Sequence, residues 1–294
     1  MTYNVLAQCY VKSSWFPYCD PKALRWKTRS NLLKQQIEAF SPRPDILCMQ
    51  ECDNFDVFWK PTMAAMGYDS LYLKKTGNKK DGVGLFWLRE KLEVLGGENV
   101  PLNDAIHSIT DPDLQGRVLL DNVGVIAHFQ FTSNSSTPQF IVASTHLFWD
   151  PAQADVKLAQ TKCMLEAIEA YRASANLSTL PVFFAGDLNS MPGSEVYEYI
   201  VSRGFSSAYA TYDDANGGEP SFTNINGVVP VDDGSTKPAF VGTLDYIFYD
   251  STKVRVKSLM KLMEYDVVTA DGGALPNRQI GSDHLPLMAE FEFA

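Results

Sequence analysis

Several features of export and membrane anchoring are missing from this sequence. It contains no apolar run of the roughly 18 residues that a membrane-spanning helix needs. Its opening residues, MTYNVLAQCYV, include neither the basic segment nor the small-residue cleavage site of a secretory leader. We therefore expect a soluble protein without membrane contacts, located in the cytoplasm, or in the nucleus or an organelle if the native chain starts with a targeting segment ahead of Met1.

Cysteine and basic residues are also few. The five cysteines are odd in number and include no C-x-x-C pair, which favours a reduced compartment over a disulfide framework. There are 25 Lys and Arg against 35 Asp and Glu, a formal charge of −10. Because affinity for a phosphate backbone comes mainly from Lys and Arg, this balance argues against a broad surface that follows duplex DNA. It leaves open an enzyme that contacts only a few phosphates.

Common nucleotide-binding and covalent-catalysis motifs are absent as well, namely Walker A, G-x-G-x-x-G and G-x-S-x-G. What remains is an ordinary globular composition, 45% apolar and 12% aromatic over 294 residues, with 19 Gly and 16 Pro. Since no linker separates two halves of the chain, we expect one domain over residues 1–294.

Short β-rich runs alternate with amphipathic helical runs along the chain. The pattern predicts strands over 3–7, 45–51, 82–87, 118–131, 140–144, 181–185, 243–249 and 285–293. It predicts helices over 22–40, 55–66, 152–172 and 195–201. The stretch 213–242 is rich in Gly, Pro, Asp, Ser and Asn, which predicts a long loop.

Polar residues recur at the ends of the predicted strands, where ligand-binding groups converge in α/β sheets. Taken singly, each has an ordinary structural alternative: a turn, a helix cap or solvated charge, a hydrogen-bonded core histidine, or a structural ion pair. The clusters are Tyr3-Asn4, Gln50-Glu51, Thr145-His146, Gly186-Asp-Leu-Asn189 and Ser282-Asp-His284, and Asp245 lies inside a further strand.

Taken together, these residues match the needs of metal-assisted phosphodiester cleavage. Carboxylates would hold Mg²⁺, which neutralises phosphate oxygens. We predict that Asp187 orients and deprotonates the attacking water and that Asn189 donates a hydrogen bond to that water. We also predict that His284, held in one tautomer by Asp245, stabilises the phosphate, with His146 on another of its oxygens.

The motifs also resemble a known family. Most of the chain is similar to the endonuclease/exonuclease/phosphatase superfamily and, within it, to the carbon catabolite repressor 4-like deadenylases, the branch that includes nocturnin and angel. The segment 150–160 is most similar to plant-type members. The resemblance implies an α/β fold of DNase I type, a four-layered sandwich of two packed mixed β-sheets flanked by helices. The matching segments are 3–8, 24–27, 44–51, 80–82, 145–151 and 243–247.

The resemblance implies roles for individual residues. The metal site would hold one or two Mg²⁺, or Mn²⁺, ions. The substrate base would be sandwiched between Pro151 and Phe240, in keeping with the stacking of single-stranded bases on aromatic and apolar faces. Ordinary alternatives are a helix start for Pro151 and a loop anchor for Phe240. The metal ligands would be Glu51, Asn4 and Asp283, and the candidates for phosphate contact are Arg117, Lys80, Lys79, Lys12 and Arg25, each with solvated surface charge as its alternative.

The resemblance also implies a function. The leading hypothesis is a Mg²⁺-dependent 3′–5′ exoribonuclease that binds single-stranded RNA at the poly(A) 3′ end and shortens the tails of mRNA, releasing 5′-AMP. The alternatives are a nocturnin-like 2′-phosphatase acting on NADP(H) and an RNA-binding scaffold with a silent site. Leucine-rich repeats for docking into a larger deadenylase complex are absent from the sequence, and we expect a monomer.

Overall fold

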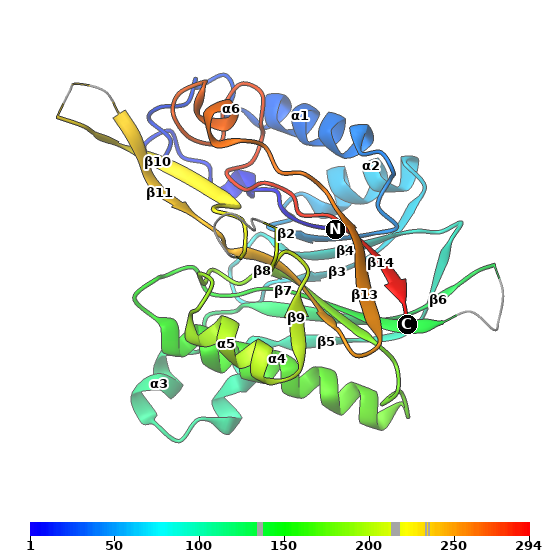
Figure 1. Cartoon of the computed structure of the whole chain (residues 1–294). Helices are drawn as coiled ribbons and strands as arrows, with labels where there is room; N and C mark the ends of the chain where they lie inside the picture. The colour runs from blue at the N-terminus through cyan, green and yellow to red at the C-terminus, as the bar shows by residue number, and fades with distance from the viewer. Residues whose placement is uncertain (134–137, 213–217, 233, 235) are drawn as a thin grey trace.

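Two β-sheets form the centre of the structure, and helices cover their outer faces (Figure 1). The computed structural model describes residues 1–133, 138–212, 218–232, 234 and 236–294. The first sheet has the order β1-β2-β4-β3, in which only β1 and β2 are parallel. Its strands are β1 (Thr2–Asn4), β2 (Ile46–Gln50), β4 (Gly82–Leu88) and β3 (Tyr68–Lys74).

The second sheet has the order β5-β6-β7-β8-β12-β9, and only β7 and β8 are parallel in it. Both sheets are therefore mixed. The strands of the second sheet are β5 (Leu92–Pro101), β6 (Val123–Phe131), β7 (Gln139–His146), β8 (Val182–Asp187), β12 (Asp245–Asp250) and β9 (Phe205–Ser207).

The remaining elements flank these sheets. Two short antiparallel pairs are β10 (Asn224–Pro230) with β11 (Thr236–Gly242) and β13 (Val254–Leu259) with β14 (Ala289–Phe293). The α-helices are α1 (Trp26–Ala39), α2 (Lys60–Ala65), α3 (Pro112–Arg117), α4 (Ala154–Ser174), α5 (Glu195–Ser202) and α6 (Tyr265–Thr269). A π-helical turn spans Phe55–Trp59, and 3-10 helices span Gln8–Tyr10 and Leu102–Ser108.

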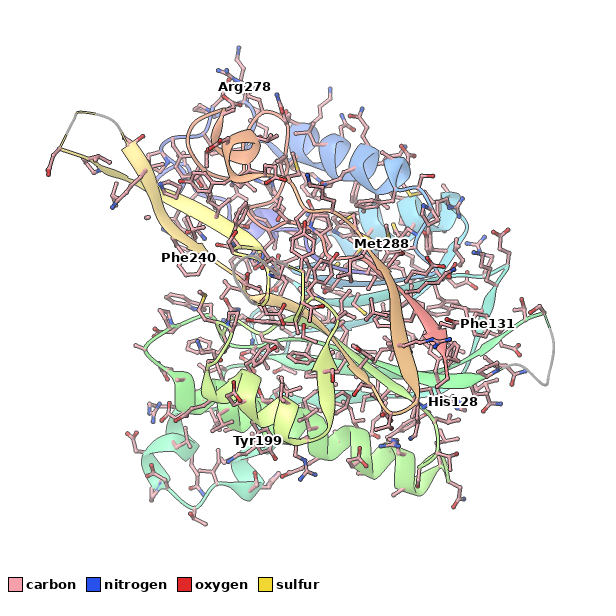
Figure 2. All side chains as sticks on the ribbon, in the orientation of Figure 1. His128, Phe131, Tyr199, Phe240, Arg278 and Met288 are labelled. Carbon is pink, nitrogen blue, oxygen red and sulfur yellow. The ribbon has the colours of Figure 1, made fainter. Side chains whose placement is uncertain are left out.

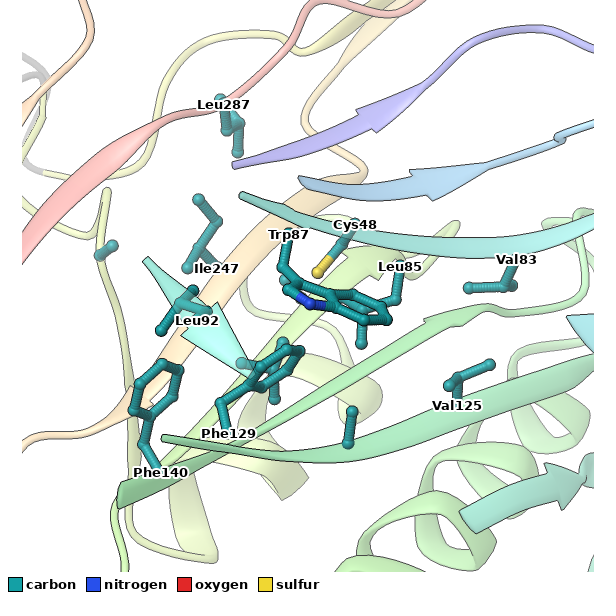
Figure 3. Packing of buried hydrophobic residues seen from close by; sticks show 14 of the residues in the cluster. Cys48, Val83, Leu85, Trp87, Leu92, Val125, Phe129, Phe140, Ile247 and Leu287 are labelled. Carbon is teal, nitrogen blue, oxygen red and sulfur yellow. The ribbon is translucent and has the colours of Figure 1, made fainter. Parts of the chain in front are cut away.

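Alternating side chains divide the core into layers, because successive residues of a strand point to opposite faces. In β2, Leu47 and Met49 pack toward α1 and α2, whereas Cys48 packs against the second sheet. In β7, Ile141 packs toward α4 and Val142 toward the first sheet. Figure 3 shows the cluster between the sheets. The order helix, sheet, sheet, helix confirms the predicted four-layered α/β sandwich.

The prediction of a loop over 213–242 is wrong for most of the residues of this segment that the structure describes. That part contains the hairpin of β10 and β11, which projects beyond the two main sheets (Figure 1). The turn-forming composition is compatible with this hairpin because Pro230 and Pro238 lie in a two-stranded sheet, in which both strands are edges. The predicted strand over 118–131 begins only at Val123. Within the described residues, no helix has the length and hydropathy to cross a bilayer.

Candidate active site

Three of the predicted catalytic residues lie side by side on neighbouring strands of the second sheet. Asp187 ends β8, and His146, the last residue of parallel strand β7, pairs with it in register. On the other side, Asp245 begins antiparallel strand β12 and also pairs with Asp187. Since adjacent strands are about 4.8 Å apart, this register gathers an imidazole and two carboxylates at one end of the sheet.

The first sheet supplies Asn4 and Glu51. The Asn4 Nδ2 donates to Glu51 Oε1 at 3.1 Å and to Asp187 Oδ2 at 2.9 Å, so it joins the two sheets. Its Oδ1 accepts the backbone N–H of Leu6 at 3.0 Å, and Glu51 Oε2 accepts that of Ala7 at 2.8 Å. Asn4 is thus a donor to the carboxylates in this arrangement.

The segment before β14 brings in Asp283 and His284. The Ser282 hydroxyl donates to the Asn4 carbonyl at 2.7 Å. The Nδ1 of His284 lies 2.8 Å from Asp245 Oδ2, and its Nε2 lies 3.7 Å from Asp187 Oδ2. Thr223 donates to the same Asp245 oxygen at 2.6 Å. The contact with Asp245 therefore sets the orientation of the His284 ring.

Buried Arg29 of α1 holds the backbone on both sides of this cluster. Its guanidinium donates to the carbonyls of Gly281 at 2.7 Å, Val5 at 2.8 Å and Leu6 at 2.5 Å, and to Gln8 Oε1 at 3.0 Å. These hydrogen bonds tie the turn after Asn4 to the turn before Asp283.

The two histidines differ in charge preference. Burial opposes a charge on His284, but the carboxylates of Asp245 and Asp187 and the hydrogen bond to Asp245 outweigh it, so its pKa lies well above 6.5. Burial holds the pKa of His146 well below 6.5, and the nearby Lys75 ammonium adds to this effect. At neutral pH, His284 is therefore a cation and His146 a neutral imidazole.

The buried carboxylates fit a cation. Burial raises the pKa of Asp187 to about 6 and that of Glu51 to about 7. Asp245 Oδ1 and Asp283 Oδ1 are buried without a hydrogen-bond partner, an arrangement that is costly unless a positive charge satisfies it. An oxygen of Asp187 and an oxygen of Asp245 also lie within 4.8 Å of each other. Oxygen-rich sites of this kind suit hard divalent cations.

A cavity of 980 Å³ opens above these residues, and Glu51, Asn189 and Asp283 all line it. The Asn189 N–H donates to Asp187 Oδ1 at 2.9 Å. Pro151, ahead of α4, and Phe240, on β11, also line the cavity. Figure 2 labels Phe240. Both residues predicted to hold a base therefore face the same space as the carboxylates.

Two residues that were predicted to contact phosphate lie outside the cavity. Arg117 is not among the cavity-lining residues, because its guanidinium is engaged by Asp155 at 2.5 Å and Asp113 at 2.7 Å. Lys80 is exposed and is likewise outside the lining, whereas its neighbour Lys79 belongs to it. The structure therefore places Arg117 and Lys80 outside this cavity, and contact of either residue with substrate stays a prediction.

One basic side chain that lines the cavity, Lys75, was not predicted from the sequence. Lys75 is buried, lies 2.7 Å from Asp81 Oδ2 and 3.4 Å from His146 Nδ1, and lines the cavity. Asp81 also accepts the Tyr10 hydroxyl at 2.6 Å. Lys75 directly follows β3, a strand that the sequence pattern did not reveal. Recognition of that strand would have placed Lys75 at a strand end with the other site residues.

Comparison with known proteins identifies the family of the chain. A model of the Endonuclease/Exonuclease/phosphatase family matches residues 1–284. The chain belongs to this family. Carbon catabolite repressor protein 4 homolog 4 of Arabidopsis thaliana is 34% identical over 99% of the chain and 76% of that relative. The Ccr4 3′-5′-exoribonuclease subunit of the CCR4-Not complex of Candida albicans is 28% identical over 99% of the chain and 40% of its own length.

Solved structures in the same comparison support the fold of this family member. ANGEL2, described as a 2′,3′-cyclic phosphatase, superposes with a TM-score of 0.81 at 24% identity, over 99% of the chain and 94% of ANGEL2. The human nocturnin catalytic domain superposes with a TM-score of 0.74 at 24% identity, over 99% of the chain and 91% of that domain. The predicted membership in this superfamily is confirmed.

Proposed function

We propose that this protein is a Mg²⁺-dependent 3′–5′ exoribonuclease that shortens poly(A) tails and releases 5′-AMP, with residues 1–294 acting as one catalytic domain. The observation that carries the proposal is the cluster of Asp187, Asn4, His146, His284 and Asp245 beside a cavity that Pro151 and Phe240 also line. Membership in a family of nucleases and phosphatases and the names of the relatives support it.

Glu51 and Asp283 would hold the metal, with the open oxygen of Asp245 nearby. When bound, a divalent cation would neutralise phosphate oxygens and steady the leaving oxygen. Asn4 holds Glu51 and Asp187 in one arrangement through its two hydrogen bonds. It acts here as a positioning residue, and direct coordination by Asn4 stays a prediction.

The chain's own groups can activate the attacking water and stabilise the charge on the phosphate. Asp187, whose pKa is raised to about 6, is a carboxylate at neutral pH and can accept the proton of the attacking water. The Asn189 backbone keeps one Asp187 oxygen in place at 2.9 Å. Cationic His284 donates from Nε2 toward the charge that develops on the phosphate, and Asp245 keeps its ring from turning. The Nε2 of neutral His146 lies 3.5 Å from the other oxygen of Asp187, Oδ2.

The walls of the cavity favour a nucleotide at the reacting position. Pro151 and Phe240 offer two apolar surfaces, and a base held between them would place its phosphate toward the carboxylates. The choice of adenine is part of the proposal, and the names of the relatives support 3′-5′ exoribonuclease activity only.

A small phosphorylated dinucleotide is the second candidate substrate. Buried Lys75 supplies a cation on the cavity wall, and the chain as a whole carries a charge of −10, a balance that suits a compact substrate such as NADP(H). The structural similarity to nocturnin supports the fold only.

The test compares the wild-type protein with Asp187→Asn and with the exposed control Asp266→Asn. Each is incubated with Mg²⁺ or EDTA on 5′-labelled oligo(A), mixed-sequence RNA of equal length, and NADPH. We expect a Mg²⁺-dependent ladder that shortens from the 3′ end, is faster on oligo(A), and is lost only in Asp187→Asn. Free phosphate from NADPH with intact RNA would support the second candidate instead.

A further inference from the structure

Two exposed tryptophans line the catalytic cavity, and the proposed chemistry uses neither of them. Trp149 is 68% exposed and Trp15 is 55% exposed. Both belong to the lining of the cavity that holds Asp187 and His284. Tryptophan is ordinarily among the more buried residues, and its exposure at a cavity is typical of a binding surface.

The two side chains reach the cavity from different parts of the fold. Trp15 lies in the loop that follows β1 and the 3-10 helix Gln8–Tyr10, whereas Trp149 lies between β7 and α4. Lys12 Nζ lies over the Trp15 ring, 4.6 Å from its centroid. The Phe148 ring packs beside Trp149, with 5.9 Å between the ring centroids. Each indole keeps more than half of its surface exposed.

Unpaired cations accompany these rings. Lys12 and Lys79 are exposed, and in the described part of the chain no acidic side chain forms an ion pair with either. Lys79 lines the cavity, and Lys12 covers Trp15. Aromatic rings for bases combined with cations for phosphates are the usual means of holding a single nucleic-acid strand.

The cavity is large for one nucleotide. Its volume of 980 Å³ is near the upper end of the roughly 300–1,000 Å³ that drug-sized ligands fill. A nucleotide that places its phosphate at Asp187 and its base at Phe240 therefore leaves room toward the tryptophans for the preceding part of the same strand.

We propose that Trp149 and Trp15 form a stacking platform for nucleotides that lie two or more positions on the 5′ side of the one that is removed, with Lys12 and Lys79 beside the connecting phosphates. This inference rests on the proposed function and narrows its substrate class to single-stranded RNA of several nucleotides. A dinucleotide cannot reach the platform and gains nothing from it.

The kinetic test measures KM and kcat on the dinucleotide ApA and on oligo(A) of about 12 nucleotides, a length within the span of about 4–16 that single-strand sites cover. For each of Trp149→Ala and Trp15→Ala, we expect KM on the longer RNA to rise about 5- to 140-fold, because each variant loses one base stack. The value of kcat should not change. KM on ApA stays at the wild-type value. Trp149→Phe keeps most of the affinity, and the exposed control Tyr265→Ala changes nothing.

An equilibrium test does not depend on turnover. Asp187→Asn is titrated with the same oligo(A) in Mg²⁺, and tryptophan fluorescence is recorded alone and in combination with Trp149→Ala. Quenching that is reduced by Trp149→Ala, with a dissociation constant weakened to a similar extent, supports the platform even if RNA is not cleaved. If both tryptophan variants cleave and bind RNA as the wild-type protein does, the platform is refuted and the proposed function is unaffected. An equal rise in KM on ApA and on the longer RNA also overturns the platform.

Discussion

Replacing Arg29 by methionine is expected to destabilise the protein strongly, because this change removes the donor that holds two turns of the active site. The guanidinium is fully buried and donates to the carbonyls of Val5, Leu6 and Gly281. Methionine has a similar length and no donor, so the change removes the hydrogen bonds and keeps most of the volume.

The expected magnitude comes from the three carbonyls. A buried acceptor left without its donor costs about 1–3 kcal/mol, so three of them set a loss of at least about 3 kcal/mol in the free energy of unfolding. For proteins of about 150–250 residues, each kcal/mol lowers Tm by about 2–4 °C, and the lower figure suits a chain of 294 residues. We therefore expect Tm to fall by at least about 6 °C.

The assay is thermal unfolding followed by circular dichroism, with Arg43→Met as the matched control. Arg43 is exposed and donates to a single carbonyl, that of Met66, so its loss should cost less than about 1 kcal/mol. Arg29→Lys keeps a charge but lacks the planar fork, and we expect an intermediate value. Equal Tm values for Arg29→Met and Arg43→Met would refute the claim that Arg29 holds these turns.

Three further predictions concern the charged groups of the site. Lys75→Met leaves Asp81 buried without its cation and should lower the free energy of unfolding, measured in urea, by about 3–5 kcal/mol. The double variant Lys75→Met/Asp81→Asn should lower it by less than the sum of the two single variants. The folded-state pKa values of Glu51, about 7, and Asp187, about 6, lie above the ordinary values near 4, so the folded state binds more protons than the unfolded state. The metal-free protein should therefore lose stability as pH rises from about 4 to about 7. Stabilisation by Mg²⁺ should be larger at pH 8 than at pH 5, and calorimetry with and without EDTA measures both effects. Asp187→Asn should raise the Tm of the metal-free protein at pH 8 while it abolishes hydrolysis, and a lower Tm would contradict the view that burial of this charge is costly.

Several strands and the polar residues at their ends could be predicted from the sequence because their signals are local, whereas the four-layered sandwich was implied by the resemblance to the family. Apolar runs that end in polar residues predicted β2, β7 and β8, and therefore placed Glu51, His146 and Asp187 at strand ends. The register that sets Asp245 opposite Asp187 depends on pairing between segments far apart in the chain, and no local pattern encodes it.

The failures have a common physical reason, since surface charges and edge strands lack a strong pattern. Arg117 satisfies its charge with Asp155 and Asp113, which only the three-dimensional structure reveals. Lys75 was missed because β3 is half-exposed along most of its length and shows no clear apolar alternation. The β10–β11 hairpin escaped notice because its prolines and glycines are typical of loops as well as of edge strands.

Asn4 reaches across from one sheet to a carboxylate of the other, and this contact links activity to the way the two halves of the chain assemble. Strands β1 to β4 and strands β6 to β8 would each keep only part of the site if the chain were cut between Leu88 and Leu92. Hydrolysis by such a fragment pair would then require the inter-sheet core around Trp87 and Phe129 to form again. Hydrolysis recovered on mixing the two fragments would therefore measure how far they reassemble.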